Sequence, residues 1–252
     1  MNNLQLEIIY WNLSSALEVA KYFNIQLLTQ QTRKSNSTSH NCIEYVVFDF
    51  DGTLALTSHI WMDINGHVLK LFGVSTDLYH YAGCIAGKTM GDVAKYTIQK
   101  YEIQATEQDL INQWTRLGTE AYSKCDFVPY ADSFINLLYS SGIKMGIATA
   151  SPRHMIESFF TRFPEIRKKI DIIVTCDEVK ANKPDPTVFI QCMKQLGCQD
   201  SSKCAIFEDS IMGLKGAKAA GANVICVLTE QGKIEEKNEL SNFSIPDYQQ
   251  LI

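Results

Sequence analysis

Short runs of apolar, often β-branched residues recur along most of the chain and alternate with stretches that carry apolar residues at helical spacing. The runs that we predict as strands are 45–49 (YVVFD), 144–150 (KMGIATA), 171–176 (DIIVTC), 204–209 (CAIFED) and 223–228 (NVICVL). Strands that are apolar along their whole length are typical of sheets buried on both faces. The pattern therefore predicts an α/β fold, a doubly wound parallel sheet with helices on both faces.

One interval interrupts this alternation and divides the chain. Residues 55–128 carry apolar residues at helical spacing and no convincing strand, which predicts a helical insert after the first strand. The core domain would then comprise residues 44–54 and 129–252. Residues 1–43 precede it as an appendage of mixed apolar patterning that ends in a polar linker.

The composition narrows the classes of function. Of the 252 residues 46% are apolar, enough for a large core, and a net charge of −5 with scattered Lys and Arg argues against a nucleic-acid partner. The eight cysteines form no Cys-x-x-Cys pair and no cluster with zinc spacing, which favours free thiols in a reducing compartment. The N-terminus lacks a basic signal-peptide start and the roughly 18 apolar residues of a membrane span. We expect a soluble, cytoplasmic protein without a membrane partner.

The first predicted strand ends in an acidic pair, Asp49 and Asp51, followed by Gly52. In doubly wound sheets, ligands bind beyond the carboxyl ends of the strands, so these carboxylates are candidates for chemistry. Because two uncompensated carboxylates repel, a divalent cation or a lysine should accompany them. A turn-forming Asp-Gly dipeptide with an incidental second aspartate is the alternative.

Other strand ends carry polar groups that fit the same site. Thr149 ends the second run, Lys183 comes directly before a proline, and Glu208 and Asp209 end the fourth run. Taken singly, the threonine is a common helix cap and the lysine a solvated surface residue. Taken together, these groups make an oxygen-rich site for Mg²⁺, with donor and cationic groups for a phosphoryl group.

The order of these motifs, DxDGT, ATAS, KP and EDS, resembles that of the haloacid dehalogenase (HAD) superfamily. It is most similar to the beta-phosphoglucomutase-like and phosphatase-like branch, in which a helical cap is inserted after the first motif. The resemblance covers roughly residues 44–252 and implies a HAD-like, Rossmannoid core with an inserted helical cap domain. Asp51 argues against the dehalogenases and phosphonate-cleaving relatives, which lack an acid at that place.

The resemblance also implies a role for each motif residue. Asp49 would be the nucleophile that forms an aspartyl-phosphate, and Asp51 the general acid and base. Groups that hold the phosphoryl oxygens would come from Thr149, Ala150 and Lys183. The implied Mg²⁺ ligands are the side chains of Asp49 and Asp209, the backbone carbonyl of Asp51, and Glu208 either directly or through water.

The chain departs from this branch at two places that bear on the substrate. Relatives often continue DGTLxDSE, whereas this chain has Leu56, Thr57 and Ser58, which puts the contacts at the core–cap junction in doubt. Phosphoglucomutase-type enzymes have a cap arginine in a GxSR segment, but here the segment reads AGKTMGD. Lys88 in this segment either substitutes for the arginine as a point charge or is an ordinary solvated lysine of the cap. The missing arginine favours hydrolysis over mutase activity.

The predicted function is a Mg²⁺-dependent phosphatase of a small phosphomonoester, a sugar phosphate or a nucleotide-related phosphate. A phosphomutase on the same scaffold is the alternative, and a catalytically idle binding protein is a further one. Aromatic and imidazole side chains of the insert either line the substrate pocket or belong to the core and surface; they are Trp61, His59, His80 and Trp114. The sequence leaves the substrate and the oligomeric state open.

Overall fold

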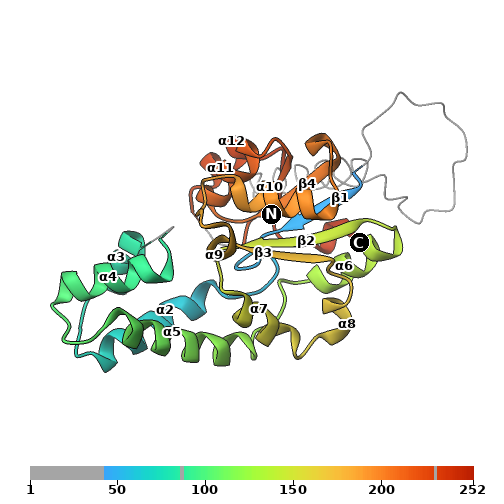
Figure 1. Cartoon of the computed structure of the whole chain (residues 1–252). Helices are drawn as coiled ribbons and strands as arrows, with labels where there is room; N and C mark the ends of the chain where they lie inside the picture. The colour runs from blue at the N-terminus through green and yellow to red at the C-terminus, as the bar shows by residue number, and fades with distance from the viewer. Residues whose placement is uncertain (1–42, 86–87, 230–231) are drawn as a thin grey trace, which may run out of the picture.

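The computed structural model describes residues 43–85, 88–229 and 232–252, and a parallel six-stranded sheet lies at its centre (Figure 1). The strands are β1 (Tyr45–Phe48), β2 (Lys144–Thr149), β3 (Ile172–Thr175), β4 (Cys204–Glu208), β5 (Asn223–Val227) and β6 (Phe243–Ile245). Their order is β3-β2-β1-β4-β5-β6. The chain thus winds outward from β1 in both directions, which confirms the predicted doubly wound sheet.

The sequence pattern found every strand except β6. This edge strand has three residues and pairs with β5 through the register Val227↔Ile245. Its middle residue, Ser244, is buried and donates to the side chain of Asn238. A three-residue run with a central serine falls below the length and apolar content by which buried strands are recognised.

Helices cover both faces of the sheet. Because side chains alternate along each strand, successive strand residues pack against helices on opposite faces. Val46 and Phe48 face one hydrophobic cluster, whereas Val47 faces the other. The helices on the first side are α6 (Ala131–Ser140), α7 (Arg153–Phe160) and α8 (Pro164–Arg167); those on the second are α10 (Thr187–Leu196), α11 (Ile211–Ala219) and α12 (Ile234–Leu240) (Figure 1). The short helix α9 (Cys176–Val179) follows β3.

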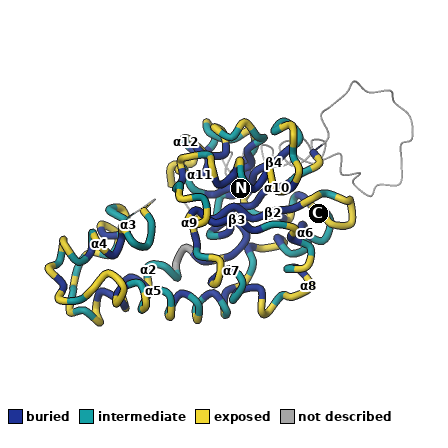
Figure 2. Tube along the Cα trace, viewed as in Figure 1, coloured by how far each residue is buried: buried dark blue, intermediate teal, exposed yellow. Residues whose placement is uncertain are grey.

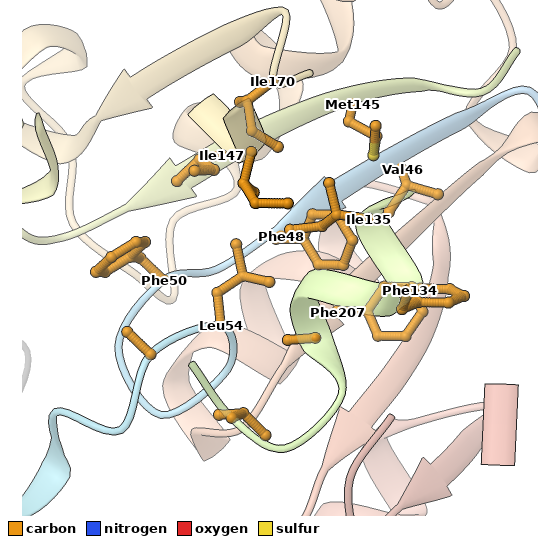
Figure 3. Close-up of a cluster of buried hydrophobic side chains, with 14 of the residues drawn as sticks. Val46, Phe48, Phe50, Leu54, Phe134, Ile135, Met145, Ile147, Ile170 and Phe207 are labelled. Carbon is orange, nitrogen blue, oxygen red and sulfur yellow. The ribbon is translucent and has the colours of Figure 1, made fainter. Parts of the chain in front are cut away.

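An aromatic cluster anchors the end of β1 (Figure 3). The ring of Phe48 lies 5.2 Å from that of Phe207 and 6.3 Å from that of Phe134, between centroids. Tyr248 joins the cluster from the C-terminal segment, and its hydroxyl donates to the carbonyl of Thr53 at 3.1 Å. Burial of each large side chain contributes about 1.5–3 kcal/mol. The loop that carries the acidic pair therefore begins from a rigid base.

Four helices lie between β1 and α6: α2 (Ser58–Leu71), α3 (Leu78–Ile85), α4 (Met90–Tyr101) and α5 (Glu107–Tyr122). They form the predicted helical insert and project to one side of the sheet (Figure 1). Their apolar faces build a separate hydrophobic cluster that includes Tyr81, Leu110 and Trp114. Figure 2 shows many exposed residues on the outer faces of these helices. The insert thus has a hydrophobic core of its own, and its role as a cap domain stays a prediction.

The two connections between insert and core run beside each other. Leu56 N–H donates to the carbonyl of Asp126, and Val128 N–H donates to that of Leu54. The predicted boundaries, 54/55 and 128/129, lie beside these hydrogen bonds and stay predictions. The predicted appendage, residues 1–43, lies outside the described residues except for Ile43. No described helix is long and apolar enough to cross a membrane.

Gly146 in β2 provides a test of the packing between the sheet and α10. A Cβ atom there would lie 2.5 Å from Cys192 Sγ and 3.2 Å from Leu196 Cδ1. We expect Gly146→Ala to lower the free energy of unfolding by about 1–3 kcal/mol, because α10 must shift. Urea unfolding would measure the change, with Lys144→Ala, at the exposed start of the same strand, as the control. Equal stability of the two variants would contradict this packing.

Candidate active site

The register of the sheet brings the predicted strand-end groups together. Phe48, the last residue of β1, pairs with Phe207 in β4 and with Ile147 in β2, and these two strands end one and two residues further on, at Glu208 and Thr149. Asp49 N–H continues the ladder by donating to the carbonyl of Phe207 at 2.9 Å. The strand order reverses at β1, which is where ligands bind in this class of fold. The site therefore begins at the end of β1.

Three carboxylates and one ammonium group meet at this point. Asp49, Glu208 and Asp209 are buried, and each offers an oxygen within 4.8 Å of those of the other two. Lys183, itself buried, pairs with Asp49 Oδ1 and lies 2.9 Å from Glu208 Oε1. Thr53 Oγ1 donates to Asp209 Oδ1 at 3.1 Å. The cluster thus contains three acidic side chains and one basic side chain.

The pKa values reflect this excess of buried negative charge. Burial raises the pKa of Asp49 to about 7; Lys183 opposes the shift, and Glu208 and Asp51 add to it. Burial lowers the pKa of Lys183, but Asp49 and Glu208 outweigh it and hold that pKa above its ordinary value. The ammonium group therefore stays charged. Hard carboxylate oxygens with uncompensated charge are what Mg²⁺ prefers, so the cluster fits that ion.

Glu208 is held from both sides. Its Oε1 faces Lys183, and its Oε2 accepts from Ser210 N–H at 2.6 Å and from the Ser210 hydroxyl at 3.0 Å. Ser210 also caps α11 by accepting from Gly213 N–H at 3.1 Å. A Cβ atom at Gly213 would overlap the carboxylate of Glu208. The start of α11 therefore needs a glycine because the carboxylate occupies the space beside it.

Asp51 accepts hydrogen bonds from a network of hydroxyl groups. Its Oδ1 accepts from Thr57 Oγ1 at 2.7 Å and from the hydroxyl of Tyr122, and its Oδ2 accepts from Ser151 Oγ at 2.5 Å. Gly52 follows in the left-handed region, with φ 73°, and turns the chain. The two aspartates of the motif are thereby separated into two environments. The side chain of Asp51 is not among the clustered carboxylates that fit a metal.

Tyr122, at the end of α5, is the centre of that network. Its hydroxyl also lies 2.8 Å from Ser151 Oγ and accepts from Trp61 Nε1 at 3.0 Å. Burial, and then the charge of Asp51, raise its pKa well above the ordinary tyrosine value, so it remains a donor. Sequence reasoning missed Tyr122, which is 71 residues from Asp51 along the chain and follows no motif. It also gave no role to Ser151, although this residue belongs to the quoted ATAS segment.

A pocket of about 380 Å³ opens between the sheet end and the insert. The predicted residues Asp51, Lys88 and Ala150 line it, as do the two tryptophans of the insert, Trp61 and Trp114. The structure thus places Trp114 in the pocket wall and in the core of the insert at once.

The remaining predicted residues lie elsewhere. Thr149, at the end of β2, is buried, and its Oγ1 accepts from Ser151 N–H at 3.0 Å. His80 is on an exposed turn of α3 and is not in the pocket wall. The side chain of His59 lies outside the described ones. Thr57, which stands at a junction position where the chain departs from the relatives, donates to Asp51.

Comparisons with known proteins agree on the family. The family model for haloacid dehalogenase-like hydrolases matches residues 46–227. The chain is 31% identical over 182 residues to the bifunctional riboflavin kinase/FMN phosphatase of Arabidopsis thaliana, covering 72% of the chain and 48% of that protein. It is 24% identical to hexitol phosphatase B of Escherichia coli O157:H7, covering 81% of the chain and 92% of that protein. The chain thus spans about half of the Arabidopsis protein.

Comparison with solved structures agrees on the fold. The crystal structure of CbbY from Rhodobacter sphaeroides in complex with phosphate superimposes with a TM-score of 0.73, at 21% sequence identity. The match covers 83% of the chain and 96% of that structure. At this identity the likeness establishes the fold, including the insert between β1 and β2, and no more.

Gly213 gives a test of the carboxylate cluster. We expect Gly213→Ala to weaken Mg²⁺ binding by about tenfold or more, because the new methyl group must displace Glu208. Isothermal titration calorimetry with MgCl₂ would measure the change. Gly83→Ala is the matched control, since a Cβ atom at Gly83 meets nothing within 4 Å. Equal affinities in the two variants would mean that Glu208 does not contribute to metal binding.

Proposed function

This chain belongs to the haloacid dehalogenase-like hydrolase family, and from that premise we propose that it is a Mg²⁺-dependent phosphatase of a small phosphomonoester. The observation that carries the proposal is the separation of the two motif aspartates. Asp49 lies buried beside Lys183 and two further carboxylates, while Asp51 lies at the wall of the pocket. One carboxylate can attack while the other moves a proton.

In the proposed reaction, Asp49 attacks phosphorus as the bond to the ester oxygen breaks, which gives an aspartyl-phosphate. Asp51 donates its proton to the departing alcohol. Asp51 then takes a proton from water, whose oxygen attacks phosphorus and releases Asp49 and inorganic phosphate. Lys183, Thr149 and Ala150 would hold the phosphoryl oxygens. A Mg²⁺ ion held by Asp49, Asp209, the Asp51 carbonyl and Glu208 would supply charge stabilisation.

A phosphomutase remains the second candidate, because Lys88 in the pocket wall offers a positive charge for another phosphate. Lysine lacks the planar fork with which arginine grips phosphate, and this favours hydrolysis. A binding protein without activity is the third candidate. The free thiols of the described cysteines support a reducing, cytoplasmic location as part of the proposal.

Release of inorganic phosphate is the direct test. With Mg²⁺ and a panel of sugar phosphates and nucleotides, we expect the protein to release phosphate without a bisphosphate activator. EDTA should abolish the release, and so should Asp49→Asn, because the amide is a far weaker nucleophile. Asp63→Asn, an exposed carboxylate on α2, is the control.

The outcomes separate the three candidates. Phosphate release that persists in Asp49→Asn would disprove the proposed nucleophile. Conversion of the substrate that requires a sugar bisphosphate and releases little phosphate would identify a mutase. A protein that binds Mg²⁺ and substrates but converts none of them would be the idle form.

Tyr122→Phe should lower kcat by about tenfold with little change in KM. The substitution removes one donor to Asp51, and a hydrogen bond to a charged group is worth about 1.5–3 kcal/mol. The ring itself would keep its stacking on Phe50, at 6.0 Å between centroids, so the fold should hold. Steady-state kinetics with the best substrate of the panel would measure both constants.

Tyr81→Phe is the matched control for this variant. Tyr81 is also a fully buried tyrosine of the insert, and its hydroxyl lies 2.7 Å from Thr97 Oγ1, within the core of the insert. If the two variants lose the same fraction of kcat, the effect of Tyr122 is on packing and not on the position of Asp51.

A further inference from the structure

The wall that the insert contributes to the pocket is almost entirely apolar. Its aromatic and aliphatic side chains are Trp61, Ala82, Ile85, Met90, Val93 and Trp114. Among the described residues, helices α2 to α5 add one polar side chain to this wall, that of Asn65 on α2, which is 5% exposed. Lys88, in the connection between α3 and α4, adds an ammonium group. On the sheet side, Asp51 and Ser151 hydrogen-bond to each other, and Asp177 of α9 adds a second carboxylate to the lining. Polarity is thus concentrated at the end where phosphate would lie.

An apolar wall of this kind does not suit a polyol. Each hydroxyl of a sugar or hexitol needs a partner when it leaves water, and a hydroxyl pressed against isoleucine, methionine or tryptophan has none. A flat ring, in contrast, buries apolar faces and can stack on indole, while a few polar atoms at its edge meet a few placed donors. The volume of about 380 Å³ lies within the range of small-molecule sites.

The indole of Trp114 gives a second sign. Its Nε1–H is buried and has no acceptor among the described residues, whereas Trp61 Nε1 is already bonded to Tyr122. Buried donors in folded proteins almost always have a partner, so this donor, on a side chain that also lines the pocket, needs an acceptor that the described residues do not supply. Trp114 is 2% exposed, and its aromatic face belongs to the same wall.

We propose, resting on the proposed phosphatase activity, that the substrate is a phosphomonoester whose alcohol carries a flat, largely apolar ring with acceptor atoms at its edge. The phosphate lies at the end of β1, and the ring lies against Trp61 and Trp114 in the insert. Flavin and nucleoside monophosphates belong to this class, whereas open-chain and simple sugar phosphates do not. The pocket wall of the insert therefore selects substrates by their ring, and the residues at the end of β1 react with the phosphate.

Two matched pairs of substrates test the proposal on the wild-type protein. FMN is compared with ribitol 5-phosphate, and uridine 5′-monophosphate with ribose 5-phosphate. Each pair has the same primary phosphate ester with and without a flat heterocyclic ring, and the ring-less member is the one that lacks this heterocycle. In at least one pair we expect kcat/KM to be about tenfold or more higher for the ring-bearing member. Equal values, or faster hydrolysis of both ring-less esters, would overturn the proposal and leave the phosphatase standing.

Binding gives a readout that does not depend on turnover. Calorimetric titration of the Asp49→Asn protein with Mg²⁺ and each of the four esters should show tighter binding of a ring-bearing ester than of its ring-less partner. If no ester is hydrolysed by the wild type but this preference is found, the proposed function fails and the ring site stands. No preference, or no binding of any ester, would overturn the ring site.

Substitutions in the wall connect the preference to its residues. Trp114→Leu should reduce the kcat/KM ratio of the preferred pair by about fivefold or more. If Trp114→Leu does not fold, Met90→Ser, at a partly buried position of the same wall, replaces it as the test variant. Tyr101→Leu, an aromatic residue of α4 outside the pocket wall, is the control and should leave the ratio unchanged. A ratio that neither wall variant alters would contradict the assignment of the ring to this wall.

Discussion

The buried contact of Lys183 with Asp49 and Glu208 is the interaction on which the rest of the site depends. Removing charged groups from water is costly, and leaving one such partner unpaired costs about 3–5 kcal/mol. The ammonium group of Lys183 must therefore lie within reach of both carboxylates. Its ammonium group also lies 4.8 Å from the centroid of the Phe189 ring, so α10 helps to hold it. The fold supplies this precision because the groups come from β1, from β4 and from the segment before α10.

The charge at this point also explains the local shape of the chain. Lys183 pairs with two of the three clustered carboxylates, those of Asp49 and Glu208, and the loop after β1, the start of α11 and the C-terminal segment pack around the cluster. Gly213 leaves room for Glu208, Thr53 donates to Asp209, and Tyr248 holds the carbonyl of Thr53. The three clustered carboxylates present hard oxygens of the kind that Mg²⁺ binds.

The sheet and the strand-end residues could be predicted from the sequence because both follow from local patterns. Apolar runs identify buried strands, and the parallel order brings their carboxyl ends to one edge, where Asp49, Glu208 and Asp209 meet. The surroundings of Asp51 could not be predicted in this way. Tyr122, the last residue of α5, lies 71 residues from Asp51 along the chain, and no sequence pattern links the two. The sequence left open whether Trp61 and Trp114 line the pocket or belong to the core, because aromatic residues at helical spacing fit both; in the structure Trp114 does both.

The same tyrosine shows how insert and core act on one group. Tyr122 ends α5, which packs on α7 of the core, where Gly118 lies against Met155 and Ser158 Oγ donates to the carbonyl of Thr119. Trp61 of α2 bonds to Tyr122 and also lines the pocket. A ligand that contacts Trp61 is therefore connected to Asp51 through two successive hydrogen bonds, from Trp61 to Tyr122 and from Tyr122 to Asp51. The wall that would recognise the alcohol and the carboxylate that would protonate it share one rigid chain of contacts, so the position of one constrains the other.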